Sequence, residues 1–464
     1  MDTKDTKSSL KIIALIWILI ECNLVAGNIF GFASLFSVLT ENGIYGSKCI
    51  EVSDETNTKS KDCRGQIIEY QLAFALGIGF YNLPAVFIGM INDFFGPRSL
   101  KLIAIVFHLI SWLSLGFTVP GRDWLIFFHT IALSLAGICT LLSSFSISAH
   151  FTQNRGLVTA LISGAQLAGS IWYAIFQVLI DNRIVTLSTL SFIWASFALL
   201  MLGSAFLFLD WRFPWIDSKL KVKATRQEII ATKSEDKLGR HLTNPLFIVV
   251  TLFLSCLLLT ISFLPVVWFP WLMYLTGGNV PLTIRYTFLY SISAAASIII
   301  APLCGLIVDF RGSRGYSQKM LNISVLQTLT WIASIALCIV CMFNSISAAL
   351  ITLAILLFSR TMLVAGSQAL IATVFPPQFI GSLLGVMWTT AGIISFATYG
   401  LVRLAKDPQY TWRAWLVILI LCLIMGGHLV QLWILYFRSK KMKKDQHLQI
   451  NAEEMQTLKS SNDI

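Results

Sequence analysis

The sequence has 464 residues, of which 56% are hydrophobic and 12% are charged. Soluble domains carry about 25% charged residues, so the composition excludes a soluble globular enzyme, a disordered chain and a nucleic-acid-binding domain. The formal net charge of +11 comes from Lys and Arg residues that lie between apolar runs. This distribution indicates membrane topology rather than a basic surface for nucleic acid.

Twelve apolar runs are each long enough to cross a bilayer as a helix, which takes about 20 residues. They form two groups of six, separated by a polar stretch. The predicted fold is therefore an all-α membrane protein with about twelve transmembrane helices. We expect the helices near residues 12–39, 69–91, 100–119, 124–148, 156–180, 184–209, 245–275, 286–307, 319–342, 347–374, 381–402 and 412–436.

The basic residues predict the orientation of these helices. With the N-terminus in the cytosol, 23 of the 34 Lys and Arg residues fall in cytosolic segments and 10 in outer loops. Positive residues prefer the cytosolic side of a membrane, which favours this orientation. The predicted segments are a cytosolic N-tail (1–11), an N-terminal six-helix half (12–209), a cytosolic middle loop (210–244), a C-terminal six-helix half (245–436) and a cytosolic C-tail (437–464).

Seven of the nine cysteines lie inside apolar runs, where cysteine behaves as a small hydrophobic residue. The other two, Cys49 and Cys63, share the first outer loop, where a disulfide can persist; two free thiols are the alternative. No Cys or His cluster has the spacing of metal ligands, and no nucleotide-binding or hydrolase motif occurs. We therefore expect no metal, no cofactor and no enzymatic activity.

One short pattern occurs twice in the chain, at an offset of 216 residues. In each copy a glycine is followed four residues later by Asp-Phe, then by a second glycine and a basic residue. Each copy ends the second span of a six-span half, and two parallel halves of this kind are an architecture of transporters. The first copy contains Gly89, Asp93, Gly96 and Arg98, and the second contains Gly305, Asp309, Gly312 and Arg314.

The residues of this pattern suit a close contact between helices. Glycine lets a neighbouring helix approach, and aspartate caps a helix N-terminus or pairs with a base such as Arg98. The pattern resembles the loop motif of the major facilitator superfamily, although Phe94 stands where that family usually has a base. The resemblance implies the major facilitator fold and an inner gate that is formed by Gly89, Asp93, Gly96, Arg98, Gly305, Asp309 and Gly312.

Two charged residues lie near the middle of predicted spans, Glu21 in the first and Arg360 in the tenth. A charge inside a membrane costs about 2.5–3.5 kcal/mol on insertion scales and points to function by default. Three interpretations stay open. The two residues form an ion pair that locks one conformation, or they anchor a substrate between the halves, or each is satisfied separately by neighbouring amides.

Uncharged polar side chains extend this candidate site. Asn28 follows Glu21 by seven residues and therefore lies on the same helix face, and Gly27 and Gly31 favour close helix packing. The fifth span has a polar face whose alternative use is helix association alone; its members are Ser163, Gln166, Ser170, Tyr173 and Gln177. The predicted substrate-binding residues are Glu21, Asn28, Gln166, Ser170, Tyr173, Arg360 and Ser367.

Several longer stretches resemble solute carrier family 43, and they extend through both halves. They are the first span from Ile20 to Leu35 with its Glu21-Cys22 pair, Thr276-Gly277-Gly278-Asn279, Ser359-Arg360-Thr361, and Val374-Phe375-Pro376 with the glycines after it. Members of that family are sodium-independent facilitators. Some carry large neutral amino acids, and one branch carries purine nucleobases; the first span is more similar to that branch. The resemblance also implies a multi-pass protein of the plasma membrane.

The sequence leaves two classes of solute open. One acid and one base at mid-depth suit a zwitterionic amino acid, whereas a neutral purine suits amides such as Gln166 and rings such as Tyr173. We expect a facilitative transporter that works by alternating access on purine nucleobases. Large neutral amino acids are the alternative, and a non-transporting solute sensor is an alternative of another class. The expected partners are a small-molecule solute and the lipid bilayer, without a nucleic acid polymer, and the sequence identifies no protein partner.

Overall fold

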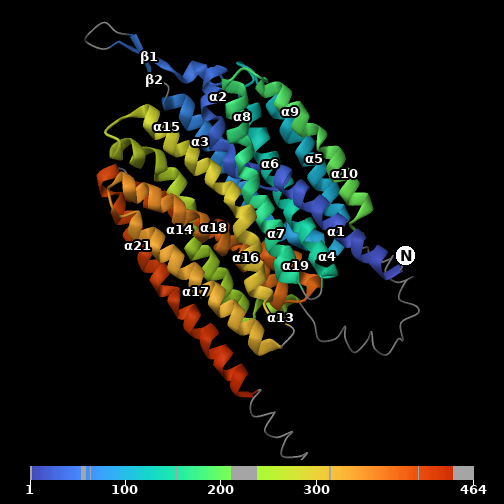
Figure 1. Cartoon of the computed structure of the whole chain (residues 1–464). Coiled ribbons are helices and arrows are strands. Elements are labelled where there is room, and N and C mark those ends of the chain that lie inside the picture. The colour runs from blue at the N-terminus through green and yellow to red at the C-terminus, as the bar shows by residue number, and fades with distance from the viewer. Residues whose placement is uncertain are drawn as a thin grey trace, which may run out of the picture.

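The computed structural model describes residues 3–53, 59–62, 64–151, 154–210, 238–312, 315–405 and 407–442. Long helices run along a bundle from one end to the other (Figure 1). Twelve helical stretches among the described residues are long and apolar enough to cross a membrane, which confirms the predicted architecture. Spans 1 to 12, in chain order, are Ser9–Glu41, Gly65–Phe95, Pro97–Gly116, Leu125–His150, Arg155–Asp181, Leu187–Leu207, Pro245–Leu275, Pro281–Asp309, Ser317–Val340, Ile346–Val374, Pro377–Leu404 and Thr411–Met442.

Many spans consist of more than one element because their helices are interrupted. The N-terminal half contains α1 (Thr3–Glu21), η1 (Cys22–Ala26), η2 (Asn28–Leu35), α2 (Phe36–Glu41), η3 (Gly46–Lys48), α3 (Arg64–Asn82), α4 (Ala85–Phe95), α5 (Pro97–Gly116), α6 (Leu125–Phe145), η4 (Ser146–His150), α7 (Arg155–Ala168), η5 (Gly169–Ile171), α8 (Trp172–Asp181), α9 (Leu187–Ser196) and α10 (Ala198–Leu207). The short helix α13 (Leu238–Leu242) precedes the C-terminal half, which contains α14 (Pro245–Leu275), α15 (Val280–Ser293), η7 (Ala294–Ala296), α16 (Ser297–Asp309), α17 (Tyr316–Val340), α18 (Ile346–Val374), η9 (Pro377–Phe379), α19 (Ile380–Ser395), α20 (Ala397–Leu404), η10 (Pro408–Tyr410) and α21 (Thr411–Ile424).

The two ends of the bundle are distinct. At one end, here called the hairpin end, β1 (Ile50–Ser53) pairs with β2 (Lys59–Asp62) as an antiparallel hairpin with Ile50 opposite Asp62. The hairpin is a small addition that the sequence analysis did not predict. The opposite end, here called the motif end, carries both copies of the repeated motif, at the close of α4 and of α16 (Figure 1).

A network of short contacts fixes the loop at the hairpin end. The Gln66 side-chain amide and the Tyr70 hydroxyl both donate to the Ile44 carbonyl, at 2.6 Å and 2.5 Å. Cys49 in the same loop is disulfide-bonded. Cys63 lies outside the described residues, so the pairing of Cys49 with Cys63 stays a prediction.

Span 1 is not a continuous α-helix. It changes to a π-helix at Cys22–Ala26 and to a 3-10 helix at Asn28–Leu35, and such changes inside a helix often mark functional positions. A Cβ atom on Gly27 would overlap the carbonyl oxygen of Gln166, and one on Gly31 would overlap the carbonyl oxygen of Ser170. Span 1 therefore packs directly on the backbone of span 5, as the glycine spacing predicts.

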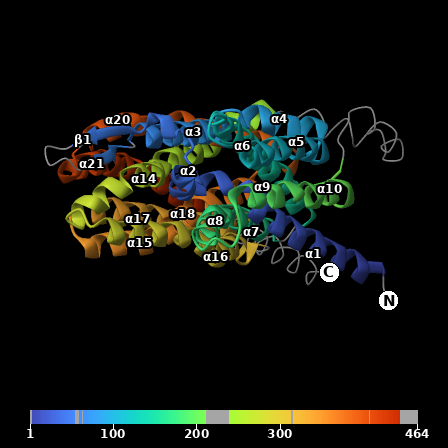
Figure 2. The ribbon, with the colours of Figure 1, turned by 90° about the horizontal axis from the view of Figure 1, so that it is seen from above.

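The two six-helix halves lie side by side. In Figure 1 the blue-to-green N-terminal half and the yellow-to-red C-terminal half occupy separate sides of the bundle, and in Figure 2, which is turned by 90°, helices of the two halves overlap. Span 2 packs on span 11 through α4 and α19, and span 5 packs on spans 8 and 10 through α7, α16 and α18. The 3-10 turns of spans 5 and 8, η5 and η7, also contact each other. The interface between the halves is thus built mainly from these five spans.

Gly27→Ala should destabilise the protein, because the added methyl group cannot avoid the Gln166 carbonyl. Overpacking of this kind costs about 1–3 kcal/mol. We expect a lower melting temperature and less monodisperse protein in fluorescence-detected size-exclusion chromatography. Gly79→Ala in α3 is the matched control, since a Cβ there meets nothing within 4 Å. Equal melting temperatures for the two variants would contradict the close packing of spans 1 and 5.

Candidate functional site

Asp93, in the last turns of α4, binds the first turn of a helix in the other half. One carboxylate oxygen accepts a hydrogen bond from the Gly381 backbone N–H at 3.1 Å, and the other accepts from the Ser382 N–H at 2.6 Å. N–H groups at a helix start have no partner within the helix, and the helix dipole favours a negative charge there. Asp93 therefore caps α19, and we call this contact the Asp93 clamp.

The second motif copy makes the equivalent contact in the opposite direction. Asp309 ends α16, and its carboxylate accepts from the Leu157 N–H at 2.7 Å in the first turn of α7. Leu157 lies in span 5 and Ser382 in span 11, which are each the fifth span of a half, so the receiving helices also correspond between the halves. This Asp309 clamp caps a helix of the N-terminal half, whereas the Asp93 clamp caps a helix of the C-terminal half.

Glycines let the clamped helices come this close. A Cβ atom on Gly89 would overlap the Gly381 carbonyl oxygen, and one on Gly305 would lie 2.5 Å from the Leu157 Cα atom. Any larger residue at either position would push the two halves apart. The first glycine of each motif copy is therefore needed for its clamp.

The second glycine differs between the copies. Gly96 has a φ of 93° and joins α4 directly to α5, which only glycine adopts without strain. Gly312 has no such backbone angle; the positive φ values in its loop are those of Arg311 and Gly315. The connection after α16 is therefore longer than the one after α4, since α16 ends at Asp309 and α17 begins only at Tyr316.

Arg98 binds a helix end within its own half. Its Nε atom donates to the Ala205 carbonyl at 2.8 Å and to the Leu209 carbonyl at 2.7 Å, where α10 finishes. Carbonyl groups at a helix C-terminus carry partial negative charge and favour a cation. Of the two roles considered for Asp93, capping a helix and pairing with Arg98, the structure shows the cap.

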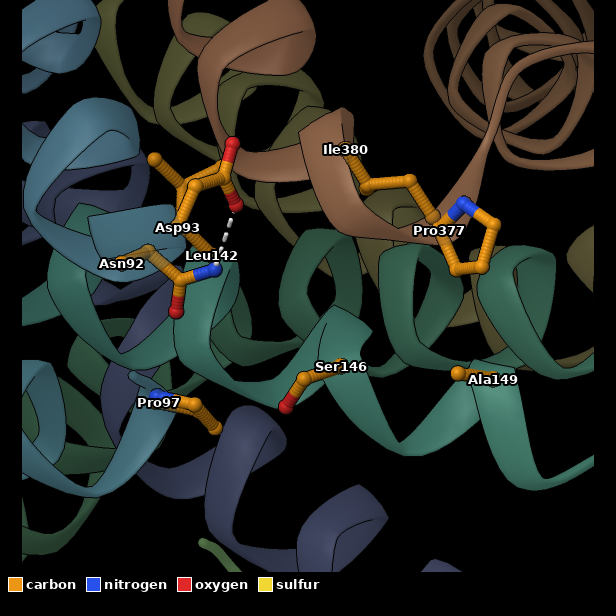
Figure 3. A pocket seen from close by; sticks show the side chains of 8 residues that line it. All are labelled: Asn92, Asp93, Pro97, Leu142, Ser146, Ala149, Pro377 and Ile380. Atoms are coloured by element: carbon orange, nitrogen blue, oxygen red, sulfur yellow. Dashed lines mark hydrogen bonds between the residues drawn. The ribbon is translucent and has the colours of Figure 1, made fainter. Parts of the chain in front are cut away.

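A small cavity lies beside the Asp93 clamp, between spans 2, 3, 4 and 11 (Figure 3). The Asn92 amide nitrogen donates to the Asp93 carboxylate at 3.2 Å, while the buried Asn92 amide oxygen has no partner. Figure 3 shows the Asp93 carboxylate directed toward the start of α19. The lining residues are Asn92, Asp93, Pro97, Leu142, Ser146, Ala149, Pro377 and Ile380.

A threonine extends the contact of spans 2 and 11 toward the middle of the bundle. The Thr389 hydroxyl oxygen accepts from the Val86 N–H at 3.0 Å and lies 3.2 Å from the Asn82 carbonyl oxygen and 3.0 Å from that of Leu83. These backbone groups border Pro84, which has no N–H to offer to the helix. Thr389 of the opposite half thus supplies hydrogen bonds to the backbone groups at which span 2 is interrupted.

The buried acid of span 1 pairs within its own half. Glu21 and Lys101 are both fully buried, and the Lys101 ammonium donates to the Glu21 carboxylate and lies 3.3 Å from the Ser144 hydroxyl. Of the three interpretations of Glu21 and Arg360, the structure therefore does not show the ion pair between them, because Glu21 pairs with Lys101. Lys101 follows Pro97 so closely in the sequence that it resembles a flanking basic residue, yet it lies inside span 3 and neutralises Glu21.

Arg360 on α18 keeps its charge without a partner in the part of the chain that the structure describes. The Tyr290 hydroxyl lies within electrostatic range of the Arg360 guanidinium, and the Tyr290 ring is 5.3 Å from the ring of Trp268. The buried Trp268 indole N–H also has no hydrogen-bond acceptor. This region of the C-terminal half therefore offers hydrogen-bond donors and one positive charge.

Three uncharged residues of the predicted site are buried and incompletely hydrogen-bonded. Neither atom of the Gln166 amide has a partner, and the Asn28 amide oxygen and the Ser367 hydroxyl have none either. Asn28 donates only to the Leu24 carbonyl, at 2.7 Å. Buried polar groups are nearly always hydrogen-bonded in folded proteins, so these atoms are candidates for contacts with a solute or with water.

Ser170 and Tyr173 are satisfied inside the N-terminal half. The Ser170 hydroxyl donates to the Leu167 carbonyl at 2.9 Å, and the Tyr173 hydroxyl lies 2.7 Å from the His129 ring nitrogen Nε2. The 3-10 turn η5 precedes Tyr173, and its tighter winding changes the angular position of the residues that follow. Gln166 lies before this turn and Tyr173 after it, and neither Ser170 nor Tyr173 is left with an unpartnered polar atom.

Two aromatic residues were missed as site candidates. Tyr81 of α3 and Trp388 of α19 are buried, and neither the hydroxyl nor the indole N–H has a partner. Their ring centroids are 6.2 Å apart across the interface of the halves. In an apolar span, a tyrosine or tryptophan is usually interpreted as a core residue or as an anchor at the membrane surface. The sequence therefore holds no signal for the contact of Tyr81 with Trp388.

Two similar six-helix halves, joined by reciprocal clamps around buried polar groups, define a membrane transporter. Residues 24–399 match the profile of the Major Facilitator Superfamily. The chain therefore belongs to this superfamily.

Three curated relatives show low identity. The bovine equilibrative nucleobase transporter 1 is 21% identical over 443 residues, covering 84% of this chain and 88% of the relative. Protein FMP42 of Saccharomyces cerevisiae is 29% identical over 182 residues, which cover 39% of this chain and 34% of that protein. The mouse large neutral amino acids transporter small subunit 3 is 27% identical, again over 39% of this chain and 34% of the relative. The last two matches thus span about a third of each relative's length.

Solved structures with the same fold are more distant in sequence. The human organic anion transporter MFSD10 superposes with a TM-score of 0.60 at 15% identity, covering 89% of this chain and 99% of that one. The proton:xylose symporter XylE superposes with a TM-score of 0.61 at 14% identity, covering 92% and 96%. These likenesses support the major facilitator fold alone.

Lys101→Met should strongly reduce the amount of folded protein, because it leaves the Glu21 carboxylate buried and unpaired. Removal of one partner of a buried ion pair costs about 3–5 kcal/mol. We expect the double variant Glu21→Gln/Lys101→Met to regain melting temperature and transport together. If the double variant folds but transports nothing, Glu21 has a direct role with the solute.

Asp93→Asn should open the motif end more often, because one amide oxygen replaces two carboxylate oxygens that accept from α19. Loss of a charge-assisted bond of about 1–3 kcal/mol shifts the equilibrium at least several-fold. We expect faster labelling of Ser146→Cys, next to the clamp, by a membrane-impermeant thiol reagent applied to the motif side. Gly239→Cys in the exposed part of α13 is the control that should label equally in both backgrounds. Unchanged labelling of Ser146→Cys would refute the role of the clamp.

Proposed function

We propose that the chain is a facilitative, sodium-independent transporter of purine nucleobases that works by alternating access. The observation that carries this proposal is the set of buried, uncharged and unpartnered polar atoms in both halves, above all the Gln166 amide. Among the relatives, the one named an equilibrative nucleobase transporter aligns over most of both chains. Both observations support a neutral, planar solute with several hydrogen-bonding groups.

The amide of Gln166 suits the edge of a purine. It supplies one acceptor and one donor group, and it lies on α7, one turn beyond Ser163, which hydrogen-bonds Gln368 of the other half. Asn28 and Ser367 add an acceptor and a hydroxyl group from spans 1 and 10. A purine bound by these groups would touch both halves, as alternating access requires.

A large neutral amino acid is the second candidate, and Arg360 is the observation that favours it. A guanidinium group without an ion-pair partner can bind a carboxylate through two parallel hydrogen bonds. The amine of such a solute lacks a counterpart, however, because the Glu21 carboxylate already pairs with Lys101. The neutralised acid therefore shifts the balance toward the nucleobase.

The two clamps act as the gate in this proposal. Opening the motif end separates α19 from Asp93 and α7 from Asp309. Because each carboxylate belongs to one half and each capped helix to the other, both clamps break together when the halves rock. We assign gating to Gly89, Asp93, Gly96, Gly305 and Asp309, and a fastening role within the N-terminal half to Arg98.

We further propose that the motif end faces the cytosol. The excess of Lys and Arg on that side supports this orientation, which places both termini inside and the hairpin with Cys49 outside. A disulfide between Cys49 and Cys63 agrees with an oxidising exterior, and the plasma membrane is the proposed location. The six-helix halves at 12–209 and 245–436 are the proposed domains.

Cells that express the chain should take up labelled adenine saturably, at a rate that does not change when sodium is removed. Gln166→Leu should raise the KM for adenine about tenfold, because one lost hydrogen bond costs about 1–1.5 kcal/mol. Gln71→Leu, on the exposed face of α3, is the matched control.

Uptake of leucine without uptake of adenine would favour the amino acid candidate, and Arg360→Ala should then abolish leucine uptake. Absence of counterflow for every solute that binds would favour a sensor.

A further inference from the structure

Tyr81 and Trp388 form an unusual pair of buried donors. Tyr81 is fully buried, Trp388 exposes 3% of its surface, and their rings meet nearly at right angles, at 88°. The Trp388 indole N–H and the Tyr81 hydroxyl have no hydrogen-bond partner. A buried polar group without a hydrogen-bond partner calls for an explanation, and one explanation is that the group binds a ligand.

The pair lies next to the hydrogen bonds that join spans 2 and 11. Trp388 precedes Thr389, and Tyr81 precedes Asn82, whose carbonyl oxygen lies 3.2 Å from the Thr389 hydroxyl oxygen. Tyr81 also packs edge-on against Phe30 of the interrupted span 1, at 5.0 Å between ring centroids. A ligand bound by Tyr81 and Trp388 would therefore contact both halves.

The same stretch of span 1 reaches Gln166. The backbone of Gly27 lies against the Gln166 carbonyl, and a Cβ on Gly137 would lie 2.7 Å from the Ala26 carbonyl oxygen and 3.3 Å from the Tyr81 ring. The segment from Ala26 to Phe30 thus contacts Tyr81 on one side and span 5 on another. Tyr81 and the Gln166 backbone therefore both lie against this short segment, and Trp388 packs on Tyr81 with 6.2 Å between ring centroids.

The chemistry of the two donors distinguishes between purines. An indole N–H can only donate, whereas a tyrosine hydroxyl donates or accepts. A 6-oxopurine carries two neighbouring acceptors, O6 and N7, while adenine carries an amino group beside N7. We propose that Trp388 donates to O6 and Tyr81 to N7, so that these residues determine specificity for 6-oxopurines over adenine. This inference rests on the proposed nucleobase transport.

The test compares initial uptake of hypoxanthine and adenine at matched surface expression. The wild-type chain should show a KM for hypoxanthine about tenfold below that for adenine, since the wrong edge leaves a buried donor unpaired. Trp388→Phe should raise the KM for hypoxanthine about tenfold and leave that for adenine nearly unchanged. Tyr81→Phe should raise both KM values, because both purines present N7.

Thr389→Val is the control for a purely structural role. It removes the hydrogen bonds next to the pair and should change the maximal rate while the ratio of the two KM values stays constant. For a variant that reaches the surface poorly, the same ratio is measured on purified protein from the shift in melting temperature that each purine causes.

Two outcomes separate this inference from the proposed function. If the wild-type chain carries purines and Trp388→Phe keeps the ratio of KM values, the assignment of Trp388 is overturned and nucleobase transport stands. If the wild-type chain carries leucine and no purine, both the inference and the proposed function are overturned.

Discussion

The arrangement of the two halves depends on a carboxylate of one half that caps a helix of the other. Asp93 and Asp309 each supply a negative charge to backbone N–H groups that have no partner in their own helix. Such bonds are stronger than neutral ones, but they form only if the helix backbones nearly touch. Gly89 and Gly305 meet that requirement because glycine has no side chain. Each clamp therefore needs both a carboxylate and a glycine.

The interruptions of the spans follow from the same need for close approach. Span 1 leaves α-helical geometry between Cys22 and Leu35, where Gly27 and Gly31 lie against span 5. Span 2 is interrupted at Pro84, and Thr389 of the other half completes its hydrogen bonds. Backbone that departs from the regular helix inside a membrane is tolerated only where other protein groups satisfy it. The interface of the halves therefore contains both the irregular backbone and the unpartnered side chains.

The sequence predicts the fold well because the apolar runs and the repeated motif are local signals. The twelve spans, the close contact at Gly27 and a helix cap as one role of Asp93 could all be derived from spacing and composition. The partner of Glu21 could not, because no local pattern records that Lys101 of α5 meets Glu21 of span 1. The contact of the Tyr173 hydroxyl with His129 could not be derived either, because it joins two different spans of the N-terminal half. Tyr81 and Trp388 meet across the interface of the two halves, and no periodicity in either span predicts that contact.

Lys101 and Arg360 differ in that only Lys101 has an ion-pair partner, and this difference has an electrical consequence. Lys101 cancels Glu21 inside the N-terminal half, so this pair carries no net charge as the halves rock. Arg360 carries its charge with the C-terminal half, and displacement of one charge across a membrane potential involves about 2.3 kcal/mol per 100 mV. If the halves alternate as proposed, the return of the empty carrier should respond to voltage even when Arg360 crosses only part of the field. A neutral solute leaves that response in place, whereas a solute with a carboxylate removes it.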